Sequence, residues 1–147
     1  METNAKIDLT MSITQDGDCS ETKYTTDAEF VEKHGRYILY FDEKNYDGDE
    51  VTRCRFELVD DSLKMRRNGP IVLEQLHIND TETDGFIKTP YGRVETKLKT
   101  FKFVFEPQAN GEFHLDLGYD LYTDGEKTGT YLLDIIIDSK PIKNLRD

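Results

Sequence analysis

One strand-like segment places an arginine where the hydrophobic pattern predicts an apolar side chain. Leu63, Met65 and Arg67 share one face of an extended chain, whereas Arg66 lies on the other face. A buried guanidinium is unfavourable unless an acidic or carbonyl partner, or the anionic group of a ligand, satisfies it. The sequence therefore predicts that Arg67 either braces the core through backbone carbonyl groups, which is the simpler interpretation, or binds an anion.

Other polar residues that can face the same interior extend this candidate ligand-binding site. They are Gln75, His77, Thr100 and Tyr119, with Tyr91 expected at a rim. A packed core residue is the simpler interpretation of His77, and Tyr119 can bury its ring and bond its hydroxyl locally.

The facing of Gln75 and His77 is open on the pattern alone. Residues 71–78 are apolar on both parities, and a one-residue slip exchanges the two faces. The inward set is either Ile71, Leu73, Gln75 and His77, or Val72, Glu74, Leu76 and Ile78.

No motif for catalysis or metal binding stands out. His34 falls in a turn and His114 on the polar face of its strand, and no nucleophile accompanies either in a recognisable pattern. The segment 47–49, Asp-Gly-Asp, resembles a fragment of a calcium loop, but the spacing that ends in a bidentate glutamate is missing. We therefore expect no catalytic residue, no metal and no cofactor.

Hydrophobic alternation predicts the strands that would position these residues. Period-two runs occur at 7–14, 52–58 and 113–121, each with one apolar face. The run 131–137 is apolar on both parities except at Asp134, so we expect it to be paired on both sides.

Two segments are harder to assign. Residues 26–29 could cap a short helix within 21–33, but the hairpin turn at 33–36 favours a strand before it. Residues 79–85 are polar and are expected to form a loop, followed by a short strand at 86–89.

The segment 89–122 holds two long strands around a turn at Asn110-Gly111. Apolar residues change parity between Leu98 and Phe101, which predicts either a β-bulge near 99–100 or a strand that passes from one packing environment to another. Bulges bend strands, and closing a sheet into a barrel requires bending.

In total the sequence predicts about eight to ten strands joined by short connections, and it shows no alternation of strands with helices. This pattern predicts an all-β fold, a single antiparallel up-and-down barrel. One domain is expected over residues 1–147, with its core at about 6–138 and a polar tail at 140–147.

The net charge of the chain limits the classes of molecule that it is expected to bind. The net charge of −11 predicts repulsion of nucleic acid and of anionic membranes, and leaves a basic protein partner or a homodimer open. The N-terminus lacks the charged and apolar regions of a signal peptide. We therefore expect a cytoplasmic protein whose two cysteines, Cys19 and Cys54, are reduced.

Several short motifs follow one another along the chain: Thr25-Thr26, the aromatic run 37–41, the segment Met65 to Gly69, Tyr91-Gly92, Thr100 and the triplet 119–121. In this order they resemble the YwiB-type family of uncharacterised bacterial proteins. The resemblance spans about Ile7 to Ile137 and implies a calycin-type, lipocalin-like barrel. It also implies the inward choice for Ile71, Leu73, Gln75 and His77, and it brings no activity or catalytic residue.

Three functional hypotheses follow. Barrels of this size can hold one small ligand, so the leading hypothesis is a non-enzymatic barrel that binds a small, partly apolar, anionic ligand in its interior. Arg67 would contact the anionic end. The alternative is an acidic protein–protein interaction module or a dimeric structural protein with a filled barrel, and a small hydrolase acting through His77 is the least favoured.

Overall fold

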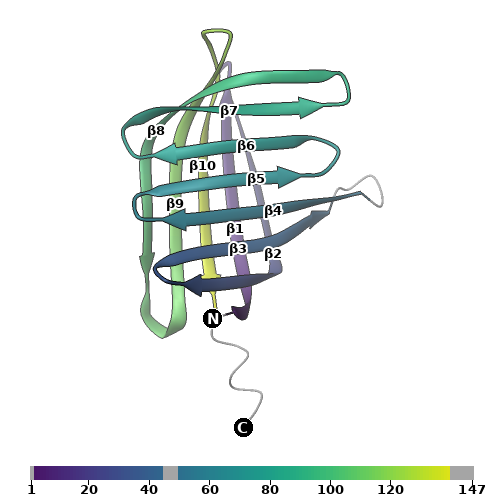
Figure 1. Cartoon of the computed structure of the whole chain (residues 1–147). Coiled ribbons are helices and arrows are strands. Elements are labelled where there is room, and N and C mark those ends of the chain that lie inside the picture. The colour runs from purple at the N-terminus through teal and green to yellow at the C-terminus, as the bar shows by residue number, and fades with distance from the viewer. Residues whose placement is uncertain (1, 45–49, 140–147) are drawn as a thin grey trace.

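The chain forms a closed antiparallel barrel of ten strands (Figure 1). The computed structural model describes residues 2–44 and 50–139. The strands are β1 (Glu2–Gln15), β2 (Asp18–Lys33), β3 (Arg36–Lys44), β4 (Val51–Val59), β5 (Ser62–Asn68), β6 (Val72–Ile78), β7 (Thr81–Thr89), β8 (Gly92–Pro107), β9 (Glu112–Thr123) and β10 (Glu126–Asp138). A short 3-10 turn, η1 (Ala109–Gly111), joins β8 to β9. The predicted all-β, up-and-down barrel is confirmed.

Two segments on which expectations were placed lie outside the described residues. They are the calcium-loop-like segment 47–49 and the polar tail 140–147.

The strands form two layers that cross each other. Figure 1 shows β3–β7 running across the front of the molecule, with β1, β9 and β10 upright behind them. The two sixteen-residue strands, β2 and β8, belong to both layers. Strand β2 pairs with β1 along 18–31 and with β3 along 29–33, while β8 pairs with β7 along 92–100 and with β9 along 97–107. The barrel therefore turns its corners at these two strands, as in orthogonally packed sheets.

Tight turns set the register of the hairpins. Asp16-Gly17 joins β1 to β2 with φ angles of 50° and 83°, and Asp124-Gly125 joins β9 to β10 with 51° and 79°. Positive φ at both central residues is typical of the type I′ turn, whose twist suits antiparallel strands and which favours Asp-Gly. Both Asp-Gly pairs therefore adopt the turn that their residue types favour.

Alternate residues of the strands fill the interior with aliphatic side chains. The largest fully buried ones are Ile7, Leu39, Leu63, Leu98, Leu115, Leu117, Leu133, Ile135 and Ile137. The predicted inner face of β9 is confirmed, because Leu115, Leu117, Tyr119 and Leu121 are all buried. The predicted inner face of β4 is confirmed as well, and Cys54 is a buried core residue there.

The bulge in β8 is also confirmed. The β8–β9 register shifts between Thr100 and Lys102, which leaves Phe101 as the extra residue. Its ring turns outward, 48% exposed, and lies over Gly118, where an added Cβ would come within 2.7 Å of it. The ambiguous segment 21–33 is part of β2, so the strand interpretation was correct.

The expected loop at 79–85 is wrong. Only Asn79 and Asp80 form the turn, and β7 already begins at Thr81. Asp80 adopts a φ of 58° and its N–H donates to the Thr100 carbonyl. The residues that follow are polar because they are mostly exposed, although they pair with β8 through the whole of 81–89. Polarity here indicated exposure, not the absence of a strand.

The expectation that Ile71 faces the barrel interior is also wrong. Ile71 precedes β6 and is 53% exposed, because the ladder between β5 and β6 begins only at Val72. The rest of that set is inward: Leu73 packs against the core, and Gln75 and His77 are buried.

Gly85 should be intolerant of any side chain. It lies opposite Gln75 in the β6–β7 ladder, and an added Cβ would meet the Glu74 carbonyl oxygen at 2.5 Å. Relieving this contact requires a displacement of the β6 backbone, which is energetically costly. Gly85→Ala should therefore lower the free energy of unfolding by roughly 1–3 kcal/mol. Urea denaturation measures this effect. Glu82→Ala on the exposed side of the same strand is the control, and equal losses in the two variants would contradict the close approach.

Candidate functional site

Arg67 lies on the inner face of β5 and pairs with an acidic residue. Its guanidinium forms an ion pair with Glu43 of β3, and the two side chains are 31% and 28% exposed. Of the two partners that the sequence allowed, acid or backbone carbonyl, the structure shows the acid. Its Nε atom, however, is buried and has no hydrogen-bond partner. The guanidinium is thus only partly satisfied by the protein.

Glu43 also receives a hydrogen bond from β2. The Tyr24 hydroxyl donates to the Glu43 carboxylate at 2.7 Å. Burial, together with the Glu43 carboxylate, raises the pKa of Tyr24 well above its usual range, so the phenol stays protonated and donating. Neither Tyr24 nor Glu43 was singled out from the sequence. The available signal was parity, because Glu43 continues the inner face of Leu39 and Phe41 on β3.

These residues lie where the barrel wall opens. The ladder between β2 and β3 ends at the pair Glu29–Tyr40, so the first part of β2 and the last part of β3 pair only with their outer neighbours β1 and β4. The Tyr24–Glu43 hydrogen bond spans this opening from one strand to the other. Cys54 lies beside it on β4, opposite Arg67, and burial raises the pKa of its thiol to about 11.

A groove lies on the outer side of the same opening. It has a volume of about 620 Å³ and is lined by Asn4, Ala5, Lys6, Asp27, Ala28, Glu29, Tyr40, Asp42 and Arg53. Ala5 and Ala28 face each other across β1 and β2, both buried. Small side chains on the two strands at this level leave room that larger ones would fill.

The other four inward candidates form a second, fully buried group. His77 Nδ1 is 2.8 Å from the Thr100 hydroxyl, and its Nε2 is 3.0 Å from Gln75 Oε1. Since the amide oxygen only accepts, Nε2 carries the proton and Nδ1 accepts from Thr100. The Tyr119 ring lies 4.5 Å from the imidazole and stacks on Tyr131 at 5.1 Å. The sequence therefore located these residues, and the structure joins them in one network.

Electrostatics keep this network neutral. Burial lowers the pKa of His77 to about 3, so the imidazole is uncharged at neutral pH. Burial also raises the pKa of Tyr119 above its usual range, while a hydrogen bond with Gln75 opposes the shift. Both ring nitrogens of His77 already form hydrogen bonds within the protein. The group therefore resembles a satisfied core network more than a general base with a nitrogen free to accept a proton.

Tyr91 is separated from the other candidates. It lies in the turn between β7 and β8 and is 99% exposed. That turn follows the pair Thr89–Gly92, whereas Thr100 lies at the opposite end of the same hairpin, beside Thr81. The structure therefore brings together five of the six candidates in two neighbouring groups and leaves Tyr91 apart.

The two hollows given by the described residues lie away from the deep interior. A second hollow, of about 290 Å³, lies near the β6–β7 turn and the β8 bulge, outside the barrel. Neither hollow reaches between the leucines around His77, which are buried to within a few per cent. Access from solvent is instead found at Arg67 and Glu43.

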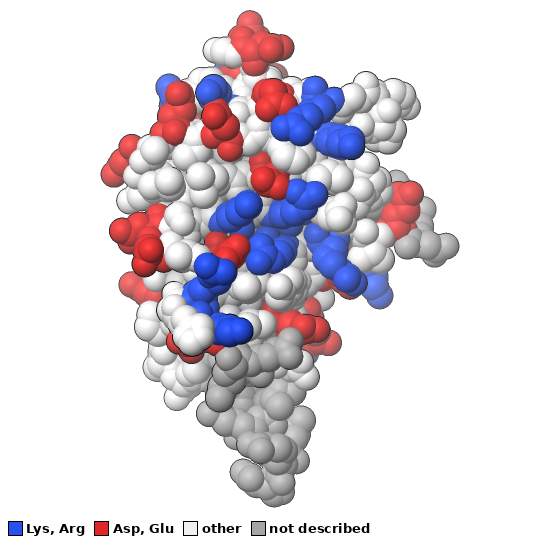
Figure 2. Space-filling model, viewed as in Figure 1, with Lys and Arg blue, Asp and Glu red and all other residues white. Residues whose placement is uncertain are grey.

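Charge is unevenly spread over the surface. Figure 2 shows Lys and Arg gathered on the front of the barrel although the chain carries a net charge of −11. Pairing of β4 with β5 brings Arg55 opposite Arg66 on this outer face. Acidic neighbours offset both, because Arg55 bonds to Glu57 at 3.2 Å and Arg66 to Glu74 at 2.5 Å. This face is therefore a mixed-charge surface and not an open anion-binding patch.

Comparison with known proteins places the chain in a family. The sequence profile described as "Domain of unknown function (DUF1934)" matches residues 7–135. The chain belongs to this family. The crystal structure of the ywiB protein from Bacillus subtilis is similar, with a TM-score of 0.80, 16% sequence identity and coverage of 94% of this chain and 92% of that one. The predicted YwiB-type resemblance is thus confirmed, and at this identity the likeness to the solved structure shows the fold alone.

Membership of this family brings no activity with it. None of the curated proteins matches the sequence. Among the described residues, none belongs to a helix with the length and apolar character that crossing a membrane requires.

Proposed function

We propose that the barrel binds a small, partly apolar anion whose acidic group reaches Arg67 through the opening between β2 and β3. The observation that carries this proposal is the incompletely satisfied guanidinium: Arg67 is about two-thirds buried, forms an ion pair with Glu43, and has a buried Nε without a hydrogen-bond partner. Arginine presents a planar fork of donors that matches a carboxylate or phosphate with two parallel hydrogen bonds.

In the absence of a ligand, the Glu43 carboxylate takes the place beside Arg67 that the acidic group of the ligand would occupy. In the free protein its carboxylate neutralises Arg67, and Tyr24 holds it in place. An anionic ligand would displace this carboxylate, which is already 28% exposed and can turn toward solvent. The affinity then reflects a competition between the two anions for one guanidinium.

The groove at the opening is the route to this position. Its volume of about 620 Å³ lies within the range of roughly 300–1,000 Å³ that small-molecule sites occupy. Phe41 and Phe56, with ring centroids 5.6 Å apart, are buried on the inner faces of β3 and β4 and form the apolar core beneath the opening. Binding at the opening also agrees with an interior that aliphatic side chains already fill.

The proposal is tested by exchanging one arginine at a time on β5. The anionic fluorophore 1-anilinonaphthalene-8-sulfonate serves as the probe, because it joins an acidic group to an apolar body. Arg67→Met should weaken its binding at least tenfold, while Arg66→Met, on the outer face of the same strand, should leave it unchanged. Fluorescence titration of the folded variants measures both. Equal affinities for the two variants, or no binding by the wild type, would remove the proposal.

The competing carboxylate provides a test of opposite sign. Glu43→Gln keeps the size of the side chain but removes the charge, so the same probe should bind more tightly than to the wild type. Native mass spectrometry of the freshly purified protein should show a co-purifying anion that Arg67→Met loses. Weaker binding by Glu43→Gln would show that Glu43 supports the site instead of competing for it.

A further inference from the structure

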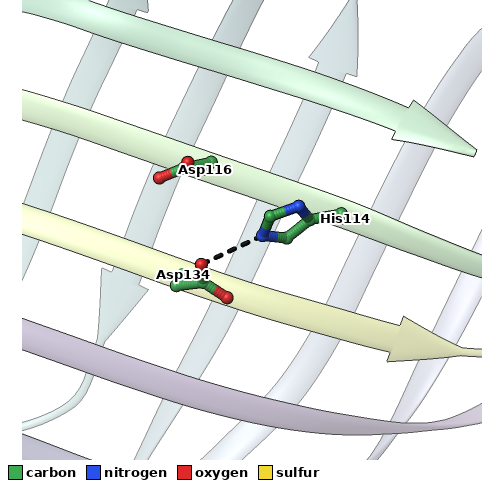
Figure 3. A group of neighbouring side chains, drawn as sticks. All are labelled: His114, Asp116 and Asp134. Carbon is green, nitrogen blue, oxygen red and sulfur yellow. Dashed lines mark hydrogen bonds and ion pairs between the residues drawn. The ribbon is translucent and has the colours of Figure 1, made fainter. Parts of the chain in front are cut away.

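A second group of chemically capable side chains lies on the outer face of the back layer. His114 and Asp116 project from β9 and Asp134 from β10, and Figure 3 shows the three side chains grouped on these adjacent strands. Their candidate ligand atoms all lie within 4.8 Å of one another, and each residue is half-buried. The group is distinct from the opening at Arg67.

Strand pairing forces the two carboxylates together. Asp116 lies directly opposite Asp134 in the β9–β10 register, and like charges in that position repel each other. Each carboxylate has a cationic or proton-donating neighbour: Lys102 Nζ is 2.8 Å from Asp116, and His114 Nε2 is 3.0 Å from Asp134. The arrangement thus concentrates negative charge on a rigid sheet and already attracts a cation to it.

We propose that His114, Asp116 and Asp134 form a binding site for a divalent transition-metal ion, with zinc as the best match. One imidazole nitrogen and two carboxylate oxygens are ligand types that zinc accepts, and three protein ligands leave a fourth position for water. Tetrahedral bonds of about 2.0–2.2 Å bring ligand atoms to roughly 3.5 Å apart. Side-chain rotation alone can supply that contraction from the observed spacing, because the strands hold the Cα atoms side by side.

The metal would replace the ion pairs now present. The Lys102 ammonium occupies the charge position beside Asp116, so it must withdraw when a divalent ion enters. Its long, half-exposed side chain can do so without disturbing the sheet. Lys102 is therefore a competitor of the metal and not a ligand.

The proximity of these three residues is not apparent from the sequence. His114 and Asp116 are two residues apart on a polar face that the alternation assigns to solvent, and Asp134 lies on another strand. The one local signal is Asp134 itself, the sole charged residue in the apolar run 131–137.

Titration of the full chain with zinc chloride in an isothermal calorimeter tests the proposal. The wild type should bind one zinc ion, and both His114→Ala and Asp134→Asn should weaken the affinity at least tenfold. His34→Ala is the matched control, since His34 lies in the exposed turn between β2 and β3, and it should bind as the wild type does. No binding by the wild type, or an equal loss in His34→Ala, would overturn the site.

A variant of Lys102 distinguishes a metal-binding site from a cluster that has only a structural role. Lys102→Ala should bind zinc several-fold more tightly than the wild type, because the ammonium no longer occupies Asp116. Zinc should also raise the melting temperature of Lys102→Ala and of the wild type but not that of Asp134→Asn, all three being folded without metal by circular dichroism. An unchanged or lower zinc affinity in Lys102→Ala would contradict the geometry.

Discussion

Leu133→Ala should lower the free energy of unfolding by about 2–5 kcal/mol, whereas Leu132→Ala should change it by less than about 1 kcal/mol. The two residues are neighbours of the same type on β10. Leu133 is 1% exposed and Leu132 is 46% exposed. Truncating the buried one removes packed methyl groups and leaves a cavity, while the other loses only partial contact on the outer face.

This pair tests the facing of β10, which the hydrophobic pattern leaves open. In the structure Leu133 pairs with Met11 on β1 and with Leu117 on β9, so it is enclosed on both sides. Urea denaturation of the two variants, each compared with the wild type, gives the difference. A larger loss in Leu132→Ala would mean that β10 is shifted by one residue.

His77 should make the protein sensitive to acid. Its pKa is lowered to about 3 in the folded state by burial and is about 6.5 in an unfolded chain. The folded state therefore binds fewer protons than the unfolded state between these two values, and stability falls as the pH falls through that window. Above pH 7 both states keep the imidazole neutral and the effect vanishes. Between pH 7 and pH 4.5 the loss due to His77 should be about 2.5 kcal/mol.

A variant without the titrating group isolates this contribution. His77→Gln should be less stable than the wild type at pH 7, because the paired Thr100 and Gln75 side chains lose a well-placed partner. The gap between the two proteins should then close as the pH is lowered, since only the wild type carries the histidine penalty. Carboxylates titrate in both proteins and cancel in the difference. Parallel stability curves over pH 4.5–7 would show that His77 is accessible to protons in the folded state.

Much of the candidate site could be located from the sequence because parity is a local property. The position of Arg67 among Leu63 and Met65 was enough to place it on the inner face, and the parity of Thr100 and Tyr119 was read in the same way. Partners could not be found in this way. Glu43 is 24 residues from Arg67 in the chain, and which strands become neighbours depends on closure of the barrel.

The same limit applies to the facing of 71–78 and to the outer group at His114. A segment that is apolar on both parities carries no period from which to choose a face, so the family resemblance, and not the pattern, implied the inward facing of Gln75 and His77 that the structure shows. Likewise, Asp116 and Asp134 become neighbours only through the β9–β10 register.

The sequence by itself determined the all-β class, the turns and most strand faces, since Asp-Gly pairs and period-two alternation act over a few residues. It also predicted the bulge in β8, because an extra residue leaves a change of parity in the chain. Tertiary structure alone decided that the wall opens between β2 and β3 and that the interior is filled. The reason is geometric: strand separation and core volume depend on how residues distant in the chain pack around a closed ring, and no short window of sequence contains that information.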